Sequence, residues 1–300
     1  MTLRVIDALR RFLPQLDAGK LDVPRRRAVW AMTHCRSAEM GGHLQFCPDC
    51  GHREFVYHSC MHRNCPLCGH RDNELWIERE REKQVGAPVF MVTFTLPAEL
   101  RGLFWGPKAK QAYDLFFRAA SSTLKDLLAN PKWLGAQKSG FSMILHTWNQ
   151  RMQFHPHIHS IVAAAGLDAQ GRVVQGKHAE FLVPQKALRQ VFRARFRDLL
   201  GKSDLEFEVD PAVWERSWGV HLEPFGDGRN AIGYLGRYVC RPVIGDNRIL
   251  EIGADHVSFR WKDRSQKGLQ REERISGTEF LKRYLRHVLP LGMRSIRHYG

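Results

Sequence analysis

Two histidines on one short segment offer the clearest chemistry in this sequence. His157 and His159 flank Ile158 and lead into the largely apolar run 160–163. On a β-strand, residues two apart project to the same side, so the two imidazoles would share one face. Imidazole is the commonest metal ligand in proteins, and two of them leave coordination positions for a third protein group, water and a phosphate oxygen. The segment therefore predicts an open metal site that supports chemistry, although a His-x-His pair by itself also occurs on surfaces and in cores.

Two matched Cys-x-x-Cys motifs predict a structural zinc. They read Cys47-Pro48-Asp49-Cys50-Gly51 and Cys65-Pro66-Leu67-Cys68-Gly69, and fourteen residues separate the two cysteine pairs. Each ends in a glycine that can take the positive φ of a turn around a metal. A redox motif needs no twin, and disulfides are disfavoured in an intracellular protein. We therefore expect a closed, non-catalytic Zn2+ site, similar to a zinc ribbon, with the ligands Cys47, Cys50, Cys65 and Cys68.

Further sulfur and imidazole donors lie near these motifs. Cys35 and Cys60 remain, and several histidines are close in sequence. They suffice for a second tetrahedral site, whose expected ligands are Cys35, His43 and Cys60. The alternative is that both cysteines are small buried apolar residues. Cys240 stands alone and is expected in the core.

Two tyrosines could act as nucleophiles. Tyr234 and Tyr238 lie four residues apart in a segment expected to be helical, so both phenols would emerge on one face, as would Arg237 and Arg241. Such pairs are often half-buried core residues. Beside a metal site in a basic chain, however, they fit phosphodiester transesterification on single-stranded DNA. A phenol with a pKa of about 10 needs help from a metal or base to attack a phosphate, and a divalent ion on the histidines would polarise that phosphate.

The composition favours a nucleic-acid partner. Lys and Arg number 46 against 31 Asp and Glu, which gives a net charge of +15 spread along the chain. A polyanion is the natural partner for such a protein. No run approaches the roughly 20 apolar residues of a membrane span, and residues 1–14 lack the apolar core of a secretory signal. We therefore expect a soluble intracellular protein without a membrane partner.

The elements that must position these residues read as α+β. We expect a central antiparallel sheet with helices mainly on one face, the histidine strand at its centre, and a small zinc-binding domain before it. The division is residues 1–85 for a helical N-terminus plus zinc-binding domain and 86–300 for the second domain. A solvated helix at 71–84 links them. Strands are expected at 89–96, 141–148, 157–165 and 214–222, a hairpin at 248–262, and helices at 108–129, 184–200, 231–240 and 278–289.

Taken together, these motifs resemble the two-tyrosine rolling-circle transposases of the HUH superfamily, similar to the insertion sequence 91 family. The resemblance covers nearly the whole chain, including the zinc module, the strand 93–97, the segment 148–159, the segment 234–241 and the closing residues 297–300. It implies an HUH nuclease fold and a DNA transposase that nicks and joins single-stranded transposon ends and target through a 5′-phosphotyrosine intermediate.

The resemblance also implies the role of each site residue. His157 and His159 become the catalytic metal pair for Mg2+ or Mn2+, Tyr234 and Tyr238 the nucleophiles with Tyr234 slightly favoured as the first, and Arg237 and Arg241 phosphate or DNA contacts. A bacterial cytoplasmic location, with the nucleoid when bound to DNA, follows. A third metal ligand is expected, with Gln150, Gln153, His155 and Glu223 as candidates.

Several alternatives stay open at this stage. The chain could be a zinc-dependent nucleic-acid-binding protein without catalysis, in which the histidines are structural. A zinc hydrolase for small molecules is disfavoured because no Glu lies in helical register with the histidines. Trp76, Trp105 and Trp133 are expected either in the core or as stacking surfaces for unpaired bases. The sequence does not reveal the oligomeric state, the DNA sequences recognised or whether a C-terminal segment is missing.

Overall fold

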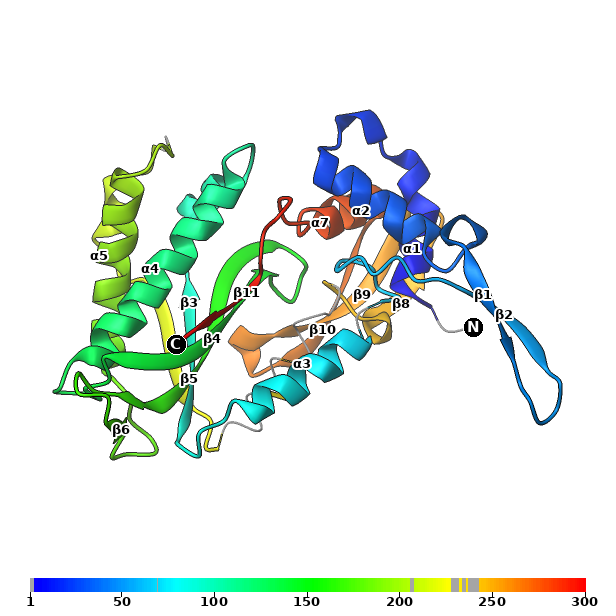
Figure 1. Ribbon diagram of the computed structural model, residues 1–300. Helices are drawn as coiled ribbons and strands as arrows, with labels where there is room; N and C mark the ends of the chain where they lie inside the picture. Colours follow the sequence, from blue (N-terminus) through cyan, green and yellow to red (C-terminus); the bar gives the residue numbers. More distant parts are fainter. Residues whose placement is uncertain (1–2, 69, 206–207, 228–231, 234–235, 237–242) are drawn as a thin grey trace. The chain divides into compact units, whose positions relative to one another are not determined.

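The computed structural model describes residues 3–68, 70–205, 208–227, 232–233, 236 and 243–300 (Figure 1). The chain forms two compact units, and neither is one continuous stretch. The first unit contains residues 1–73, 148–154 and 240–291, and the second contains 74–147, 155–239 and 292–300. The C-terminal half of the sequence therefore contributes to both units. The expected division into 1–85 and 86–300 assigned all of that half to the second domain.

The second unit is built on an antiparallel sheet in the order β11-β4-β5-β3-β7, with β6 paired to β5. The long strand β5 lies at the centre, as the sequence predicts for the histidine strand. Register pairs Thr93 of β3 with His159 of β5, and Thr95 with His157. The strands are β3 (Val89–Thr95), β4 (Lys138–Trp148), β5 (Phe154–Leu167), β6 (Val173–Gln175), β7 (Gly219–Pro224) and β11 (Ile296–Tyr299).

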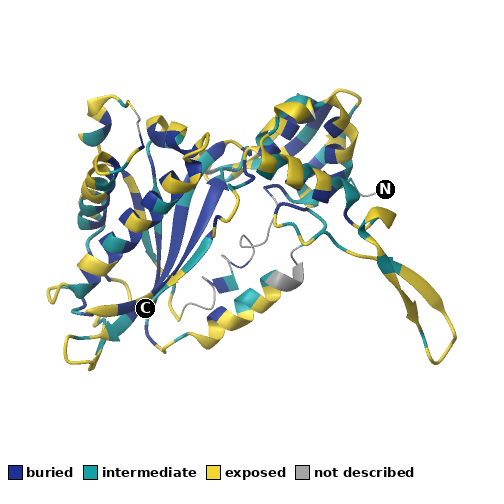
Figure 2. Cartoon of the chain, turned by 45° about the horizontal axis from the view of Figure 1, so that its top comes forward, coloured by how far each residue is buried: buried dark blue, intermediate teal, exposed yellow. Residues whose placement is uncertain are grey.

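One face of this sheet packs against two helices, α4 (Ala109–Ala129) and α5 (Gln185–Gly201) (Figure 1). Phe94 of β3 contacts Phe192 of α5 with ring centroids 4.9 Å apart, and Phe192 contacts Phe116 of α4 at 5.9 Å. Because strand side chains alternate, Ile158 lies on this apolar face. It is fully buried, as Figure 2 shows for the strands of this sheet.

The other face carries the odd-numbered side chains of β5 and is covered in part by α3 (His70–Glu82). Ser142 of β4 donates a 2.7 Å hydrogen bond to Glu80, whose carboxylate is buried. Trp76 and Ile77 pack on a small cluster of sheet residues that includes Val89 and Ile161. The helix expected at 71–84 is confirmed, but the part from Glu74 onward covers the sheet and is not a solvated linker.

The first unit combines three helices with a second sheet. The helices are α1 (Val5–Phe12), α2 (Val23–His34) and α7 (Gly277–Leu285), and the sheet has the order β10-β9-β8. The strands are β8 (Ile249–Ile252), β9 (His256–Asp263) and β10 (Leu269–Ser276). The amphipathic α1 buries its apolar residues, such as Phe12, against Phe280 and its neighbours. The sequence predicts the hairpin at 248–262, whereas β10 is a third strand that it did not anticipate.

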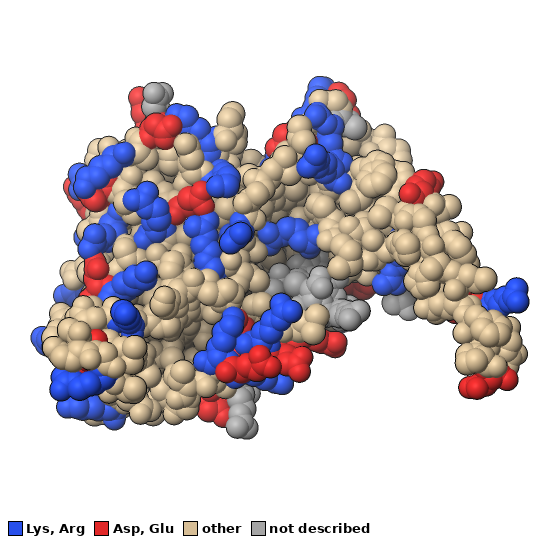
Figure 3. Space-filling view, in the orientation of Figure 1, with Lys and Arg blue, Asp and Glu red and all other residues tan. Residues whose placement is uncertain are grey.

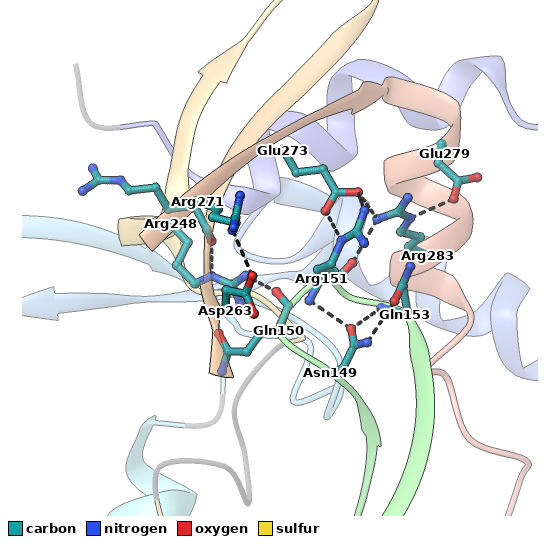
Figure 4. Close-up of polar contacts among 11 residues, drawn as sticks. Asn149, Gln150, Arg151, Gln153, Arg248, Asp263, Arg271, Glu273, Glu279 and Arg283 are labelled. Carbon is teal, nitrogen blue, oxygen red and sulfur yellow. Dashed lines mark hydrogen bonds and ion pairs between the residues drawn. The ribbon is translucent and has the colours of Figure 1, made fainter. Parts of the chain in front are cut away.

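A partly buried ion network holds this unit together around the turn at residues 149–153 (Figure 4). Glu273 of β10 accepts two hydrogen bonds from Arg151, at 2.8 and 3.0 Å, and one from Arg283 of α7 at 2.9 Å. Arg283 also donates to the backbone oxygen of Arg151 at 3.0 Å and to Glu279 at 2.8 Å. The turn between β4 and β5 is thus tied to both β10 and α7.

A two-stranded ribbon, β1 (Gly42–Phe46) and β2 (Arg53–Tyr57), extends from the first unit and is largely exposed (Figure 2). The strands pair antiparallel, with Leu44 opposite Phe55. Cys47 and Cys50 lie in the turn that joins them, where Gly51 has φ +68° as the motif predicts. A strand of five residues spans about 17 Å, so the turn lies far from the base of the ribbon.

The sequence-based expectations for fold class and element types are otherwise confirmed. The α+β architecture, the antiparallel sheet and the strands and helices at 89–96, 108–129, 141–148 and 184–200 agree with the structure to within a few residues. The strand expected at 214–222 begins later, at Gly219. The helix expected at 231–240 falls mostly outside the described residues, although Ile232, Gly233 and Gly236 are helical. The closing residues form β11, which the sequence did not predict.

Candidate functional site

Three histidines converge on the face of the central sheet opposite α4 and α5. His157 and His159 come from β5, and His146 joins them from the neighbouring β4. Their ring centroids lie 4.7 Å apart for His146 and His159, 4.8 Å for His157 and His159, and 5.3 Å for His146 and His157. One ligand nitrogen from each ring lies within 4.8 Å of the others. The two histidines predicted from the sequence therefore lie together, and β4 supplies the third imidazole.

Hydrogen bonds from neighbouring groups fix the orientation of two of these rings. His157 Nδ1 donates to the backbone oxygen of His155 at 2.7 Å. Because a carbonyl only accepts, this bond leaves the lone pair on Nε2 of His157, the nitrogen that can bind a metal. His159 Nδ1 lies 2.9 Å from Thr93 Oγ1 on β3. The ring of His157 is thus held by β5 itself, and the ring of His159 is held by the neighbouring β3.

Burial favours the neutral form of His146. His146 is buried, and burial together with the nearby His157 lowers its pKa well below the usual range. A neutral imidazole is the form that binds a metal. Burial also lowers the pKa of His155 to about 4, helped by Arg101, whose Nη2 lies 2.8 Å from His155 Nδ1. His157 is only half-buried, so a ligand can reach the site from its side.

The structure places a histidine that was not among the four candidates for a third ligand beside the pair. Among the four candidates, His155 contacts Arg101, and Glu223 pairs with His221 on β7. Gln150 and Gln153 belong to the turn in the first unit. His146 was missed. The available signal was a histidine within the buried run 143–147 of a strand, where a polar side chain needs a reason to be present.

Tyr234, Tyr238, Arg237, Arg241 and Cys240 lie outside the described residues. Two described neighbours give the local context. Ile232 is buried against Val89, Met91, Ile144 and Ile161. Ile161 lies two residues from His159, and Ile144 two residues from His146, so Ile232 packs on the same face of the sheet as the three histidines.

Gly236 lies against α3 at the same time. A Cβ atom added to it would come within 2.2 Å of Ile77 Cγ1 and within 3.6 Å of Trp76. Only a glycine allows the backbone to approach α3 so closely. Ile232 and Gly236 are therefore both packed within the second unit.

A second donor cluster consists of four thiols in the first unit. Cys35 follows α2, and Cys60, Cys65 and Cys68 lie in the loop between β2 and α3. Sγ of Cys68 lies 3.5 Å from that of Cys35 and 3.8 Å from that of Cys60. Tetrahedral zinc with Zn–S bonds of about 2.3 Å requires S···S separations of about 3.8 Å. The four thiols fit a structural Zn2+ site.

Backbone groups and burial complete this thiol site. The backbone N–H of Cys60 donates to Cys35 Sγ at 3.4 Å, and that of His62 to Cys60 Sγ at 3.5 Å. Burial raises the pKa of Cys60 to about 12 and also raises that of Cys65. All six described cysteines are free thiols. Zn2+ binding would deprotonate the four thiols of this site, and the free energy of metal binding would add to the stability of the folded unit.

The arrangement differs from the predicted ligand sets. Cys65 and Cys68 group with Cys35 and Cys60, and not with Cys47 and Cys50, which lie in the turn of the ribbon. Cys35 and Cys60 do share a site, but His43 is not part of it. His43 lies on β1, with Nδ1 3.3 Å from His58 Nε2. Two matched Cys-x-x-Cys motifs predicted a single site similar to a zinc ribbon. In the structure, the length of the β1–β2 strand pair separates the first motif from the second.

The turn of the ribbon is a separate thiol pair. Backbone N–H groups of Cys50 and Asp49 lower the pKa of Cys47, and the thiol of Cys50 adds to this. Within the described part of the chain, no third metal-binding side chain joins this pair.

Comparisons with known proteins identify the family of this chain. The family described as "Putative transposase" matches residues 140–300, and the "Transposase zinc-binding domain" matches residues 7–96. The chain is 35% identical to the putative transposase y4qJ of Sinorhizobium fredii, over 99% of this chain and 79% of that protein. It is 29% identical to the transposase for insertion sequence element IS801 of Pseudomonas savastanoi pv. phaseolicola, over 95% of this chain and 72% of that protein.

Solved structures of a conjugative relaxase match less than half of this chain. A metal-bound structure of the conjugative relaxase TrwC in complex with oriT DNA is 14% identical, covers 46% of this chain and 49% of that chain, and has a TM-score of 0.34. A metal-free structure of the same relaxase has a TM-score of 0.32 at 13% identity. Within the described residues, no helix has the length and apolar character to span a membrane.

Proposed function

Because this chain belongs to the putative transposase family and carries the matching transposase zinc-binding domain, we propose that it cuts and joins single-stranded DNA through a covalent bond between tyrosine and a 5′ phosphate. The reaction is a metal-assisted transesterification. It requires a divalent-cation site, a phenol and a DNA strand at one place. The proposal goes beyond family membership in naming the chemistry and the residues.

The observation that carries this proposal is the shared face of the sheet. His146, His157 and His159 form a three-imidazole site, and Ile232 packs on the same face along the same two strands. Two residues along a strand span about 7 Å, so the described end of the tyrosine segment begins close to the histidines. This supports the proposal that Tyr234 and Tyr238, which follow Ile232 in the sequence, are the nucleophiles, and we propose Tyr234 as the first.

Each residue has a defined part in the proposed reaction. The phenol oxygen of a tyrosine attacks the phosphorus, the bond from phosphorus to the 3′ oxygen breaks, and the 3′ hydroxyl leaves with a proton. A later 3′ hydroxyl attacks the phosphotyrosine, which restores the phenol and joins the strands. Arg237 and Arg241 are proposed to contact the phosphates. No ATP is required, because the phosphotyrosine bond preserves the energy of the original linkage.

The three imidazoles suit a divalent cation that accepts nitrogen ligands. When bound, such an ion polarises the scissile phosphate and offsets the charge that develops on its oxygens. Mg2+ and Mn2+ are the proposed ions. The hydrogen bonds to His155 and Thr93 hold two rings in place before DNA arrives.

The four-thiol site has a structural role in this proposal. Four thiolates close the coordination sphere of Zn2+, which leaves no position for a substrate. Cys35 and Cys65 are buried in the main core of the first unit. The zinc therefore stabilises that unit, and the histidine site carries out the chemistry.

A covalent-adduct assay tests the proposal. Labelled single strands covering the DNA on both sides of the gene would be incubated with the protein and Mn2+, and protein–DNA adducts resolved on a denaturing gel. We expect an adduct that disappears with EDTA, with His157→Ala, and with Tyr234→Phe plus Tyr238→Phe. Tyr57→Phe, on the exposed ribbon, is the matched control and should leave the adduct intact.

Two results would contradict the proposal. An adduct that survives the double tyrosine substitution would mean that another residue is the nucleophile. Binding of the same strands without cleavage, at any Mn2+ concentration and for every strand tested, would indicate the alternative, a zinc-dependent nucleic-acid-binding protein without catalysis.

A further inference from the structure

A stripe of arginines follows α5 beside its buried side. The helix buries every fourth residue from Leu188 to Leu200 against the sheet. The residue after three of these is an arginine: Arg189, Arg193 and Arg197. One residue turns a helix by about 100°, so these arginines line the flank next to the buried stripe. Lys186 and Lys202 extend the stripe at its two ends.

Backbone carbonyls hold two of these guanidinium groups in place. Arg193 Nη1 donates to the backbone oxygens of Glu215 and Arg216, at 3.1 and 2.9 Å. Arg189 Nε donates to that of Val220 at 3.2 Å. A guanidinium has five N–H donors, so at least three on each arginine remain for a ligand. These contacts order the side chains without neutralising their charge.

The stripe and the segment 214–218 line an open surface groove, which we call the α5 channel. It consists of two adjoining hollows of about 520 and 450 Å3 that share Arg193. The first also contains Arg197, Lys202 and Trp214, and the second contains Lys186 and Arg189. The guanidinium of Arg197 lies 5.9 Å from the ring of Trp214.

The channel has an excess of positive charge. Its lining includes two carboxylates, Asp198 and Glu215. Asp198 pairs with Lys202 at 2.8 Å. Among the described residues, none of the carboxylates lies within 4.0 Å of the guanidinium nitrogens of Arg189, Arg193 or Arg197. Three cations are thus available to an anion.

The channel lies on the helical side of the sheet, and the three histidines lie on the opposite face. Lys and Arg side chains are spread over the α4 and α5 side of this unit in Figure 3. Layers of secondary structure pack about 10 Å apart, so a strand that lies in the channel cannot also place a phosphate at the histidines without passing around an edge of the sheet.

We propose that the α5 channel binds the phosphate backbone of a second DNA segment, a duplex, distinct from the strand that is cut at the histidines. This rests on the proposed function, because strand transfer requires two DNA segments on one enzyme. From Lys186 to Lys202 the helix advances about 24 Å, which matches about seven phosphates of one strand at 3.4 Å each. The Trp214 ring already contacts Arg197 and Trp218, so contacts between the cations and the DNA backbone are the main interaction that the channel offers.

Duplex binding by the full chain tests this proposal. Fluorescence anisotropy would measure the affinity for a labelled duplex of about 30 base pairs across a range of salt concentrations. The test variant is Lys186→Gln, Arg193→Gln and Arg197→Gln. The control variant, Lys110→Gln, Lys132→Gln and Lys138→Gln, removes the same charge from exposed positions outside the channel.

We expect the test variant to bind the duplex about tenfold or more weakly and to reduce the slope of log affinity against log salt by about 2 to 3, since each phosphate contact contributes about 0.9. The control variant should change affinity less than about twofold. Equal loss in both variants would show that only net charge matters and would overturn the proposal, as would an unchanged test variant. A test variant that loses affinity for single strands instead would assign the channel to the cut strand and also overturn it.

A further variant separates this proposal from the proposed function. His157→Ala plus His159→Ala should lose the covalent adduct and retain duplex affinity. If the duplex result holds while no protein–DNA adduct ever forms, the channel stands and the proposed chemistry fails.

Discussion

Replacement of His146 by Gln is expected to weaken metal binding at the histidine site about 100-fold or more. His146 supplies one of three imidazoles, and its ring lies 4.7 and 5.3 Å from those of its two partners. Loss of a group that merely orients a metal ligand costs about 10- to 100-fold in affinity, so loss of the ligand itself should reach at least the upper end, or about 3 kcal/mol. Gln fills most of the space of the buried ring, which avoids the cost of a cavity, about 2–5 kcal/mol for a large side chain.

The assay compares metal binding and adduct formation in the same protein. Isothermal titration calorimetry with Mn2+ gives the affinity, and the adduct gel gives the Mn2+ concentration for half-maximal activity. Both should shift by the same factor, with activity partly restored at high Mn2+. His221→Gln, on β7 outside the trio, is the control and should leave both unchanged. If His146→Gln binds Mn2+ as tightly as the unaltered protein, the three-histidine site is wrong.

Three further predictions concern packing and stability. Cys60→Ser should remove one bound zinc per chain and lower the thermal unfolding temperature of the first unit, while Cys47→Ser should retain that zinc; equal metal content in both variants would refute the four-thiol assignment. Glu273→Gln should destabilise the first unit by about 2–3 kcal/mol in denaturant unfolding at pH 7. Burial raises the pKa of Glu273, but its hydrogen bonds to two arginines lower it overall. The stabilisation is therefore present above the ordinary glutamate pKa and is lost as the pH falls through the lower pKa of the folded state. The variant should lack this dependence on acid. Gly236→Ala should reduce adduct formation because its Cβ would collide with Ile77, and Ile77→Ala should partly restore activity; full activity of Gly236→Ala alone would refute the packing.

The sequence predicted element types better than the connections between units. Alternation and β-branched runs located β3, β4 and β5, because local burial on a sheet leaves a period of two in the sequence. The strand β10 and the edge strand β11 were missed. The strand β11 pairs with β4, which is distant in the chain. The strand β10 pairs with the preceding β9, but it is mostly polar because its side chains are largely exposed, so it lacks the apolar pattern of a buried strand. Residues 240–291 and 1–73 belong to one unit, and no local pattern in the sequence indicates that these two segments pack together.

The histidine pair was determined by sequence alone, since a spacing of two on any strand places both rings on one side. The third imidazole was decided by tertiary structure, because only the pairing of β4 with β5 brings His146 to them. The same contrast holds for the cysteines. Their types and clustering predicted zinc, whereas the length of the β1–β2 ribbon decided that Cys35 and Cys60, and not Cys47 and Cys50, join Cys65 and Cys68. Spacing along a chain fixes distances within one element, and only the packing of elements fixes distances between them.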